Sequence, residues 1–256
     1  MQNRIDQLFA KKQHGILNIY CTAGFPQLND TLPVMTALQQ HGADIIELGM
    51  PFSDPLADGP VIQNSGTIAL QNGMSLRVLF EQLQHFRERI HIPVILMGYL
   101  NPVLLYGVEA FVKKCAETGI DGIILPDLPM AEYEEVYKPI FEKYNVHLIF
   151  LVTPETSDAR LRKLDSLSKG FLYAVSSSST TGKDKDINMQ QSYFERLQQM
   201  KLSNPVLIGF NIRDKASFDA AAQYANGAII GTAFIRAIEN SKNIDETVRT
   251  FIATIK

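Results

Sequence analysis

Three carboxylates stand close together in the stretch IIELGMPFSDPLADGPVIQ, which runs from Ile45 to Gln63. Glu47 falls inside an apolar run, whereas Asp54 and Asp58 follow it in a segment rich in proline and glycine. A carboxyl group that loses water keeps its proton to higher pH and suits general acid/base catalysis, whereas one on an open loop stays ionised. The stretch therefore predicts two roles for two carboxyl groups, acid/base chemistry at Glu47 and a fixed negative charge at Asp58.

Each carboxylate also has an ordinary structural explanation. Glu47 could pair with a neighbouring lysine or a backbone amide, and Asp54 and Asp58 could serve turns beside Pro55 and Gly59. The two aspartates could also bind a divalent cation, but two loop carboxylates without further ligands make a weak site. The five histidines show no metal-ligand spacing. We therefore expect no metal ion, and we expect His147 to be a structural residue.

Eight short apolar runs are expected to form the strands that position the carboxylates. Longer amphipathic segments separate one run from the next. The runs are ILNIYC from Ile16, DIIELG from Asp44, PVILMG from Pro93, GIILP from Gly122, HLIFLV from His147, FLYAVS from Phe171, PVLIGF from Pro205 and AIIG from Ala228. Nearly continuous apolar strands that alternate with helices are typical of a parallel sheet covered on both faces. The pattern predicts an α/β fold, a single (β/α)8 TIM barrel over residues 1–256 with an extra N-terminal helix. An open, doubly wound sheet is the alternative.

Composition narrows the class of partner and the compartment. With 256 residues, 46% of them hydrophobic, and a formal charge of −3, the chain lacks the basic excess of a nucleic-acid-binding protein. The two cysteines, Cys21 and Cys115, form no disulfide framework, which fits a reducing cytoplasm. Charged residues interrupt the N-terminus, and no later run is long enough to span a membrane. We expect a cytoplasmic protein with a small-molecule partner, and neither nucleic acid nor membrane.

The segment ELGMPFSDPLADGPVIQ resembles the signature of the tryptophan synthase alpha subunit family. Further motifs follow in the order and spacing of that family: YCTAGFP, MGYLNPVLLYG, LPDLP, LVTPETSDARL, FLYAVSSSSTTG, IGFNI and GTAF. The resemblance implies a lyase that splits indole-3-glycerol phosphate into indole and glyceraldehyde 3-phosphate by a retro-aldol reaction. It also implies that indole passes to a beta subunit for tryptophan biosynthesis.

The resemblance assigns roles to particular residues. It implies that Glu47 is the catalytic acid/base, that Asp58 holds the indole nitrogen, and that Tyr173 assists at the cleaved bond. Without the resemblance, Tyr173 would be an ordinary half-buried strand aromatic. The expected substrate-binding residues are Tyr20, Tyr99, Thr181, Gly182, Gly209, Asn211, Gly231 and Thr232.

The loops after the seventh and eighth strands are expected to bind the phosphate, as in many barrels of this class. Backbone amides near Gly209 and Gly231 could surround the anion. The glycines could instead, or also, serve tight turns that need positive φ, with GTAF starting a helix. Two positions depart from the family: Asn211 replaces a glycine of the usual Gly-Phe-Gly, and Ser177 stands where an arginine is common. Asparagine tolerates left-handed backbone better than most residues, which softens the first departure.

The resemblance also implies a partner. No cofactor is expected in this chain, and pyridoxal phosphate is expected only in the beta subunit of an alpha2beta2 complex. An excess of apolar residues in the loops after the second and third strands would suit a protein interface. These residues are Pro51, Phe52, Pro55, Leu56, Pro102 and Leu105. Two alternatives stay open: a lyase that works alone, and a non-catalytic barrel that only activates its partner. Intact Glu47 and Asp58 disfavour the second alternative.

Overall fold

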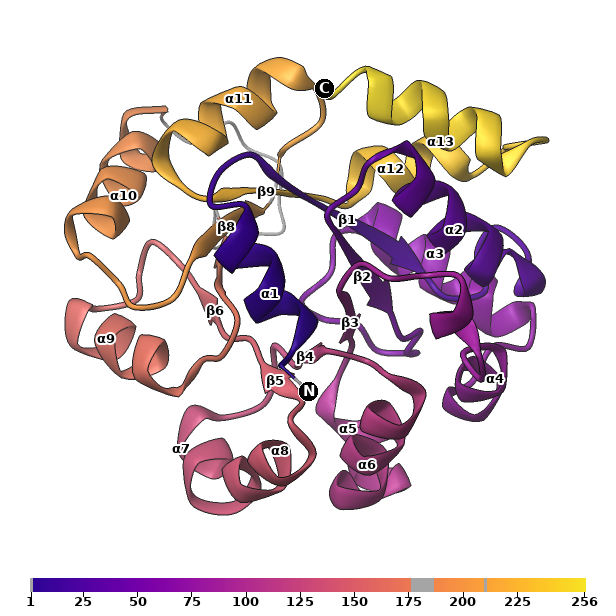
Figure 1. Ribbon diagram of the computed structural model, residues 1–256, viewed down its shortest axis with the longest axis horizontal. Helices are drawn as coiled ribbons and strands as arrows, with labels where there is room; N and C mark the ends of the chain where they lie inside the picture. Colours follow the sequence, from indigo (N-terminus) through magenta and orange to yellow (C-terminus); the bar gives the residue numbers. More distant parts are fainter. Residues whose placement is uncertain (1, 176–186, 210) are drawn as a thin grey trace.

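Parallel strands form one sheet that curls into a barrel, drawn in Figure 1. The computed structural model describes residues 2–175, 187–209 and 211–256. Within these ranges the nine strands of the sheet are β1 (Ile16–Thr22), β2 (Ile45–Gly49), β3 (Val94–Met97), β4 (Gly122–Ile124), β5 (His147–Leu148), β6 (Leu151–Val152), β7 (Leu172–Val175), β8 (Val206–Gly209) and β9 (Gly227–Ile230). Their order in the sheet is β5-β4-β3-β2-β1-β9-β8-β7-β6. All eight predicted strands are present, and the fifth is divided in two.

The division of the fifth strand is also the point at which the ring closes. β5 pairs with β4, and β6 pairs with β7. Between them, the amide of Ile149 donates to the carbonyl of Ile123, and the carbonyl of Phe150 accepts from the amide of Tyr173. The segment from His147 to Val152 therefore joins both edges of the sheet, and the predicted (β/α)8 barrel is confirmed.

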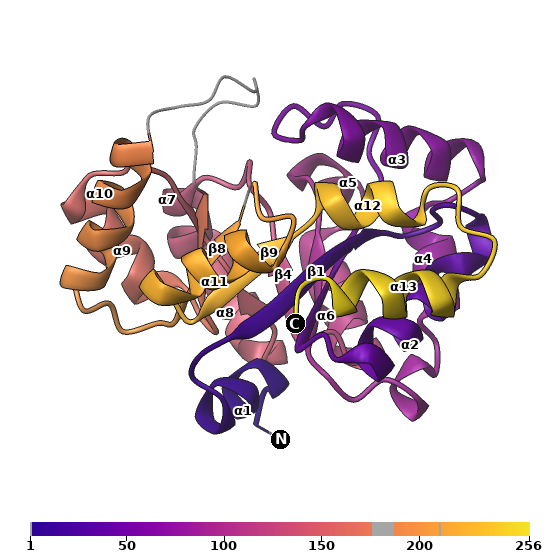
Figure 2. The same ribbon diagram turned by 90° about the horizontal axis from the view of Figure 1, so that it is seen from above.

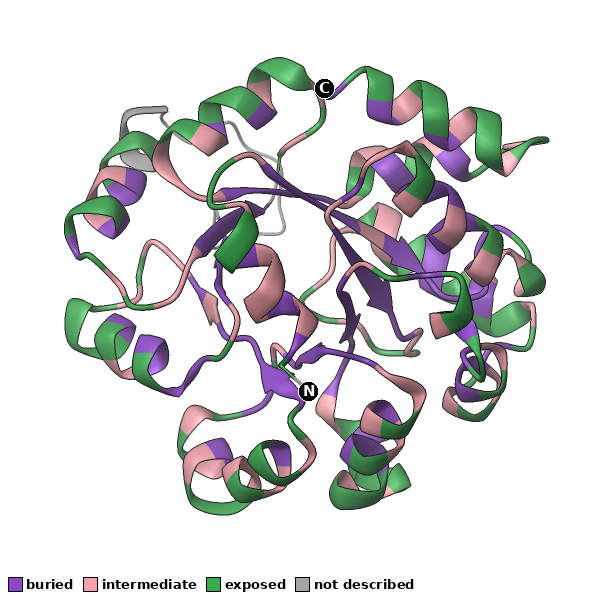
Figure 3. Cartoon of the chain, in the orientation of Figure 1, coloured by how far each residue is buried: buried purple, intermediate pink, exposed green. Residues whose placement is uncertain are grey.

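Helices surround the sheet on its outer side (Figure 1). Their bounds are α1 (Arg4–Lys11), α2 (Thr31–His41), α3 (Pro60–Gln71), α4 (Leu76–Gln82), α5 (Leu100–Tyr106), α6 (Val108–Thr118), α7 (Met130–Glu132), α8 (Lys138–Tyr144), α9 (Asp158–Leu167), α10 (Ile187–Gln199), α11 (Lys215–Tyr224), α12 (Thr232–Ile238) and α13 (Ile244–Ala253). Short 3-10 turns cover Leu28–Asp30 and Phe86–Glu88, and Tyr133–Tyr137 forms a π-helical turn. The helices cover the outer face of the sheet and apolar side chains fill the barrel inside it. The strands are therefore buried on both faces, as Figure 3 shows.

The apolar core has two layers, one on each face of the sheet. The outer layer packs strands against helices and includes Ile46 and Leu48 of β2. The inner layer fills the barrel and includes Ile45 of the same strand. Successive strand residues point to opposite faces, so Glu47 points into the barrel with Ile45. The sequence alone did not determine this direction, because apolar residues occupy both faces of the strand.

The predicted extra helix, α1, closes one end of the barrel. Its residues Ile5 and Phe9 join the inner apolar layer, and Figure 2 shows the helix at the end away from α3. Arg4 forms an ion pair with Asp121 at 3.0 Å, and Asp6 contacts Nε2 of His147 at 2.9 Å. His147 is therefore a partnered structural residue, as expected. The open end of the barrel is the one at which the strands terminate.

Cys21 and Cys115 are free thiols, and both are buried. None of the helices in the described part of the chain combines the length and the apolar character needed to cross a bilayer.

Candidate active site

Glu47 lies inside the barrel near the carboxyl ends of the strands. Only 1% of its surface is exposed, and its Oε2 accepts a hydrogen bond from Nδ2 of Asn18 on β1 at 2.9 Å. Burial raises the pKa of the Glu47 carboxyl group to about 8, the Asn18 hydrogen bond opposes this shift, and the charge of Asp58 adds to it. Glu47 can therefore both hold and release a proton near neutral pH, which general acid/base catalysis requires.

Asp58 lies in the loop between β2 and α3, and Tyr99 holds that loop in place. The Tyr99 hydroxyl accepts a hydrogen bond from the amide of Ala57 at 3.0 Å, and its ring packs on Phe52 at a centroid distance of 5.4 Å. Burial raises the pKa of Asp58 to about 6, and a hydrogen bond from Tyr99 opposes the rise. Asp58 is therefore still mainly ionised at pH 7, as the sequence predicted.

Asp54 differs from Asp58 although both belong to the same loop. Its side chain is exposed and accepts a hydrogen bond from the Ser53 hydroxyl, and its carbonyl accepts from the amide of Leu56 at 3.0 Å. These contacts are those of an exposed turn residue. Burial thus distinguishes the two loop aspartates, and Asp58, whose pKa burial raises, acts electrostatically on Glu47.

Tyr20 and Tyr173 complete the group of polar side chains around Glu47. Tyr20 lies opposite Glu47 in the register of β1 and β2, and Tyr173, on β7, is 6% exposed. Burial raises the pKa of both phenols well above its ordinary value, and the charges of Glu47 and Asp58 add to that effect. Both phenols therefore stay protonated near neutral pH and can donate hydrogen bonds.

Two glycines make room for these tyrosine rings. A side chain at Gly49 would place its Cβ 2.1 Å from the Tyr20 hydroxyl oxygen, and one at Gly209 would come within 2.5 Å of the Tyr173 ring. Gly209 is a strand residue and does not have positive φ. The interpretation of Gly209 as a tight-turn glycine is therefore wrong, since its lack of a side chain accommodates Tyr173.

The residues expected to bind phosphate lie at the ends of neighbouring strands. Gly209 ends β8, and Gly231 directly follows β9, with which β8 pairs. Thr232 begins α12, so GTAF is a strand-to-helix transition, and Gly231, with φ of −116°, is not a positive-φ turn. Asn211 has φ of +60°, the left-handed conformation that the sequence suggested it would have to tolerate. Thr181, Gly182 and Ser177 lie outside the described residues.

Asn18 is the site residue that sequence analysis missed. It is fully buried, and its hydrogen bond to Glu47 makes it a direct neighbour of the candidate catalytic group. A signal was present, because Asn18 interrupts the otherwise apolar run ILNIYC two residues before Tyr20. Residues two apart on a strand share a face, so the asparagine lies on the same side of β1 as the tyrosine.

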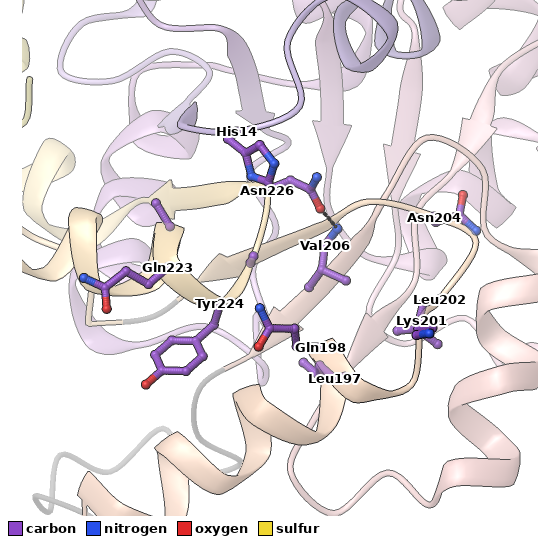
Figure 4. Close-up of a pocket in the computed structure, with 12 residues that line it drawn as sticks. His14, Leu197, Gln198, Lys201, Leu202, Asn204, Val206, Gln223, Tyr224 and Asn226 are labelled. Atoms are coloured by element: carbon purple, nitrogen blue, oxygen red, sulfur yellow. Dashed lines mark hydrogen bonds between the residues drawn. The ribbon is translucent and has the colours of Figure 1, made fainter.

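A separate pocket of about 240 Å³ lies near the other end of the barrel (Figure 4). It lies beside the starts of β8 and β9 and contains none of the predicted site residues. Asn226 in its wall accepts from the amide of Val206 at 2.9 Å and donates to the carbonyl of Gln13 at 2.7 Å. These bonds connect the segment before β1 to β8 and β9, so Asn226 has a structural role. Within residues 2–175, 187–209 and 211–256, no three His, Cys, Asp or Glu side chains gather as a metal site would require.

Comparisons with known proteins agree over nearly the whole chain. The family model described as tryptophan synthase alpha chain matches residues 6–256. The tryptophan synthase alpha chain of Flavobacterium johnsoniae is 55% identical over 240 residues, which cover 93% of this chain and 94% of the relative. That of Flavobacterium psychrophilum is 51% identical over 254 residues, which cover 99% of both chains.

Solved structures give the same result. The tryptophan synthase subunit alpha from Legionella pneumophila superposes with a TM-score of 0.90 at 32% identity, covering 100% of this chain and 97% of that one. The tryptophan synthase A-subunit from Pyrococcus furiosus gives a TM-score of 0.86 at 33% identity, covering 95% and 98%. Sequence and fold thus agree from end to end, and the chain belongs to the tryptophan synthase alpha chain family.

Proposed function

We propose that this chain is a lyase that cleaves indole-3-glycerol phosphate into indole and glyceraldehyde 3-phosphate. The observation that carries the proposal is Glu47, a carboxyl group enclosed by the apolar barrel at the end where the strands terminate, with a pKa of about 8. Such a group can give and take a proton near neutral pH without a metal ion or a covalent adduct.

Glu47 performs two proton transfers in this reaction. Its protonated form first donates to C3 of the indole ring, which turns the ring into a cationic tautomer. The resulting carboxylate then removes the proton from the hydroxyl group on the adjacent side-chain carbon. The bond between that carbon and C3 breaks, an aldehyde forms, and the bonding electron pair returns to the ring. Glu47 ends the cycle protonated, as it began.

Asp58 and Tyr173 stabilise the charges that develop in these steps. The Asp58 carboxylate lies beside the ring nitrogen, where positive charge appears only as C3 is protonated, so it favours the transition state over the ground state. The Tyr173 phenol stays protonated and donates a hydrogen bond to the oxygen of the side chain at the cleaved bond. Tyr20 lines the ring pocket, and Tyr99 acts through Asp58 by fixing its loop.

The phosphate group binds where β8 and β9 end. Gly209, Asn211, Gly231 and Thr232 offer backbone amides and a hydroxyl at this edge, and the amino end of a helix favours an anion. Thr181 and Gly182, which lie outside the described residues, are part of the same proposal. The interpretation agrees with the general location of phosphate sites in barrels of this class.

Asn211→Gly should leave phosphate binding intact or tighten it. The native residue has φ of +60°, a conformation that glycine adopts without steric cost and through which the backbone can approach a ligand closely. Asn211→Val is the contrasting variant, because a β-branched residue is strained at this φ and should weaken binding. Titration of glycerol phosphate against the three proteins measures the effect. A large loss in Asn211→Gly would show that the asparagine side chain itself binds phosphate.

A beta subunit is the proposed partner, in an alpha2beta2 complex. Leu56 and Leu105 are 88% and 83% exposed, on the loop after β2 and on α5 after β3. Exposed apolar side chains of this size commonly mark a protein interface, and Asp58 shares the loop that carries Leu56. Pro51, Phe52, Pro55 and Pro102 are only half-buried and extend the same surface. The isolated chain is proposed to be a weakly active monomer that becomes more active when the partner orders this loop.

Asp54→Ala should weaken activation by the partner more than it weakens basal cleavage. Asp54 is exposed beside Leu56, whereas Asp58 is partly buried. The measurement is indole release by wild type and Asp54→Ala across a titration with the pyridoxal-phosphate-dependent beta subunit. An equal fractional loss with and without the partner would leave Asp54 a simple turn residue.

The same assay separates the two alternatives. A lyase that works alone would release indole at full rate without the partner, and a non-catalytic barrel would release none even with it. No cofactor is proposed for this chain, because the Glu47 carboxyl group supplies both proton transfers, and pyridoxal phosphate is proposed only for the partner. A cytoplasmic location is part of the same proposal, since Cys21 and Cys115 are free thiols.

A further inference from the structure

Asn18 places a polar amide inside the barrel, where its neighbours are apolar. The inner layer is formed largely by isoleucines, among them Ile16 on the same strand and Ile45 on β2. Asn18 has no exposed surface, and its position opposite Ile45 in the strand register puts it one step below Glu47. An aliphatic residue would fill this position at no cost in hydrogen bonding, so packing does not explain the asparagine.

In the described part of the chain, only the nitrogen end of the Asn18 amide group forms a hydrogen bond. Its Nδ2 donates to Oε2 of Glu47 at 2.9 Å, whereas its buried Oδ1 has no hydrogen-bond partner in the part of the chain that the structure describes. A buried acceptor without a partner costs stability. The free oxygen also means that no second bond fixes the orientation of the amide. The group can therefore turn about its terminal torsion and present either nitrogen or oxygen to Glu47.

We propose that Asn18 is a positioning residue that holds the Glu47 carboxyl group through both of its protonation states. Its Nδ2 donates to the carboxylate, and, after the amide turns, its Oδ1 accepts the proton of the carboxylic acid. The inference rests on the proposed function, in which Glu47 alternates between these two states within each cycle. Asn18 keeps the carboxyl oxygens in place while the proton leaves and returns.

The titratable groups that face Glu47 determine what removal of Asn18 should do. They are Tyr20 on β1, Asp58 in the loop after β2, and Tyr173 on β7. Cys21 lies on the outer face of β1 and interacts with Glu47 only electrostatically. Burial raises the pKa of the two phenols and of the thiol, so these three groups stay neutral near pH 8. Burial and the Asp58 charge raise the pKa of Glu47, and the Asn18 hydrogen bond opposes both. Loss of the amide should therefore raise the pKa of Glu47 further.

The test replaces Asn18 by leucine, which has a similar size and suits the isoleucine-lined interior. In Asn18→Leu we expect kcat for indole release to fall about ten- to a hundredfold, the scale of a lost hydrogen bond to a charged group, with little change in KM. Protonated Glu47 starts the cycle, so the upper limb of the pH–rate profile should move to higher pH, by about one unit for a tenfold effect. Asn18→Thr retains a hydroxyl that can donate and accept, and should lie between leucine and wild type.

A second measurement does not depend on activity. In protein labelled with carbon-13 at the glutamate carboxyl groups, the Glu47 signal is identified by its loss in Glu47→Gln, and its pKa is read from a pH titration. The pKa should rise in Asn18→Leu and stay unchanged in Ile45→Val, a matched control that removes one methyl group from the same interior. An unchanged Glu47 pKa and kcat in Asn18→Leu would overturn the inference, and so would an equal shift in Ile45→Val. Absence of indole release from wild type would contradict the proposed function, while the titration would still report the effect of Asn18 on Glu47.

Discussion

Glu47→Gln should lower kcat for indole release by about two to four orders of magnitude, the contribution typical of a positioned general acid/base. Glutamine keeps the shape of the side chain and can still accept the hydrogen bond from Asn18, but it cannot exchange a proton. KM and the affinity for glycerol phosphate should therefore change little. Single-turnover and steady-state assays of the purified variant, with and without the beta subunit, measure the effect. Near-normal turnover in Glu47→Gln would show that Glu47 is not the general acid/base.

The same variant should be more stable than wild type at alkaline pH. Glu47 has a pKa of about 8 in the folded chain against an ordinary value of 4.5, so the folded state binds its proton more tightly than the unfolded state. Stability from this group is complete below pH 4.5 and is lost as pH rises through 8. Glutamine does not ionise, so the loss should be absent in the variant. Thermal unfolding at pH 5 and at pH 9 checks this, since the difference in Tm should be larger at pH 9.

The loss of kcat and the gain in stability of Glu47→Gln together distinguish a catalytic role of Glu47 from a purely structural one. A carboxyl group buried for packing alone would give a variant that is more stable and equally active. A carboxyl group that serves proton transfer gives a variant that is more stable and nearly inactive. A protein commonly retains such a destabilising group only at a site of function.

The alternation of strands and helices was readable in the sequence because each buried strand is a short apolar run between longer amphipathic segments. The same feature hid the orientation of Glu47. In a strand with two buried faces, Ile45, Ile46 and Leu48 are all apolar, so no alternation shows which face is the interior. The inward direction follows from the place of Ile45 in the inner layer, and the hydrogen bond from Asn18 of the neighbouring strand agrees with it.

Long-range contacts also determined roles that spacing could not assign. The substrate-binding role expected of Tyr99 stays a prediction, and the structure adds a structural role, because its hydroxyl accepts from the amide of Ala57, forty-two residues earlier in the chain. Gly209 was considered as a turn glycine, yet it makes room for the Tyr173 ring on the neighbouring strand. In both cases the decisive contact joins residues far apart in sequence, so local propensity carries no information about it. The family resemblance identified these residues, and the three-dimensional contacts give physical reasons for them.

Asp58→Asn should lower kcat by about two to three orders of magnitude, the range found when one electrostatic contact to a developing charge is lost. Asparagine keeps the size and the contact with Tyr99 but removes the negative charge that faces the indole nitrogen. Asp58→Glu should retain part of the activity, because charge rather than shape is the function there. Asp54→Asn in the absence of the partner is the matched control: it removes an exposed carboxylate from the same loop and should change basal cleavage far less.

The pH profile of kcat/KM tests whether the ionised form of Asp58 is required and whether its charge acts on Glu47. The ionised form is required, and its pKa is about 6, so wild-type activity should fall as pH drops below 6. In Asp58→Asn this lower limb should disappear. The upper limb should also move to lower pH, because the Asp58 charge that helps to raise the pKa of Glu47 is gone. An Asp58→Asn protein that keeps both limbs unchanged would show that Asp58 neither carries the required charge nor acts on Glu47, and its loop would then serve the interface alone.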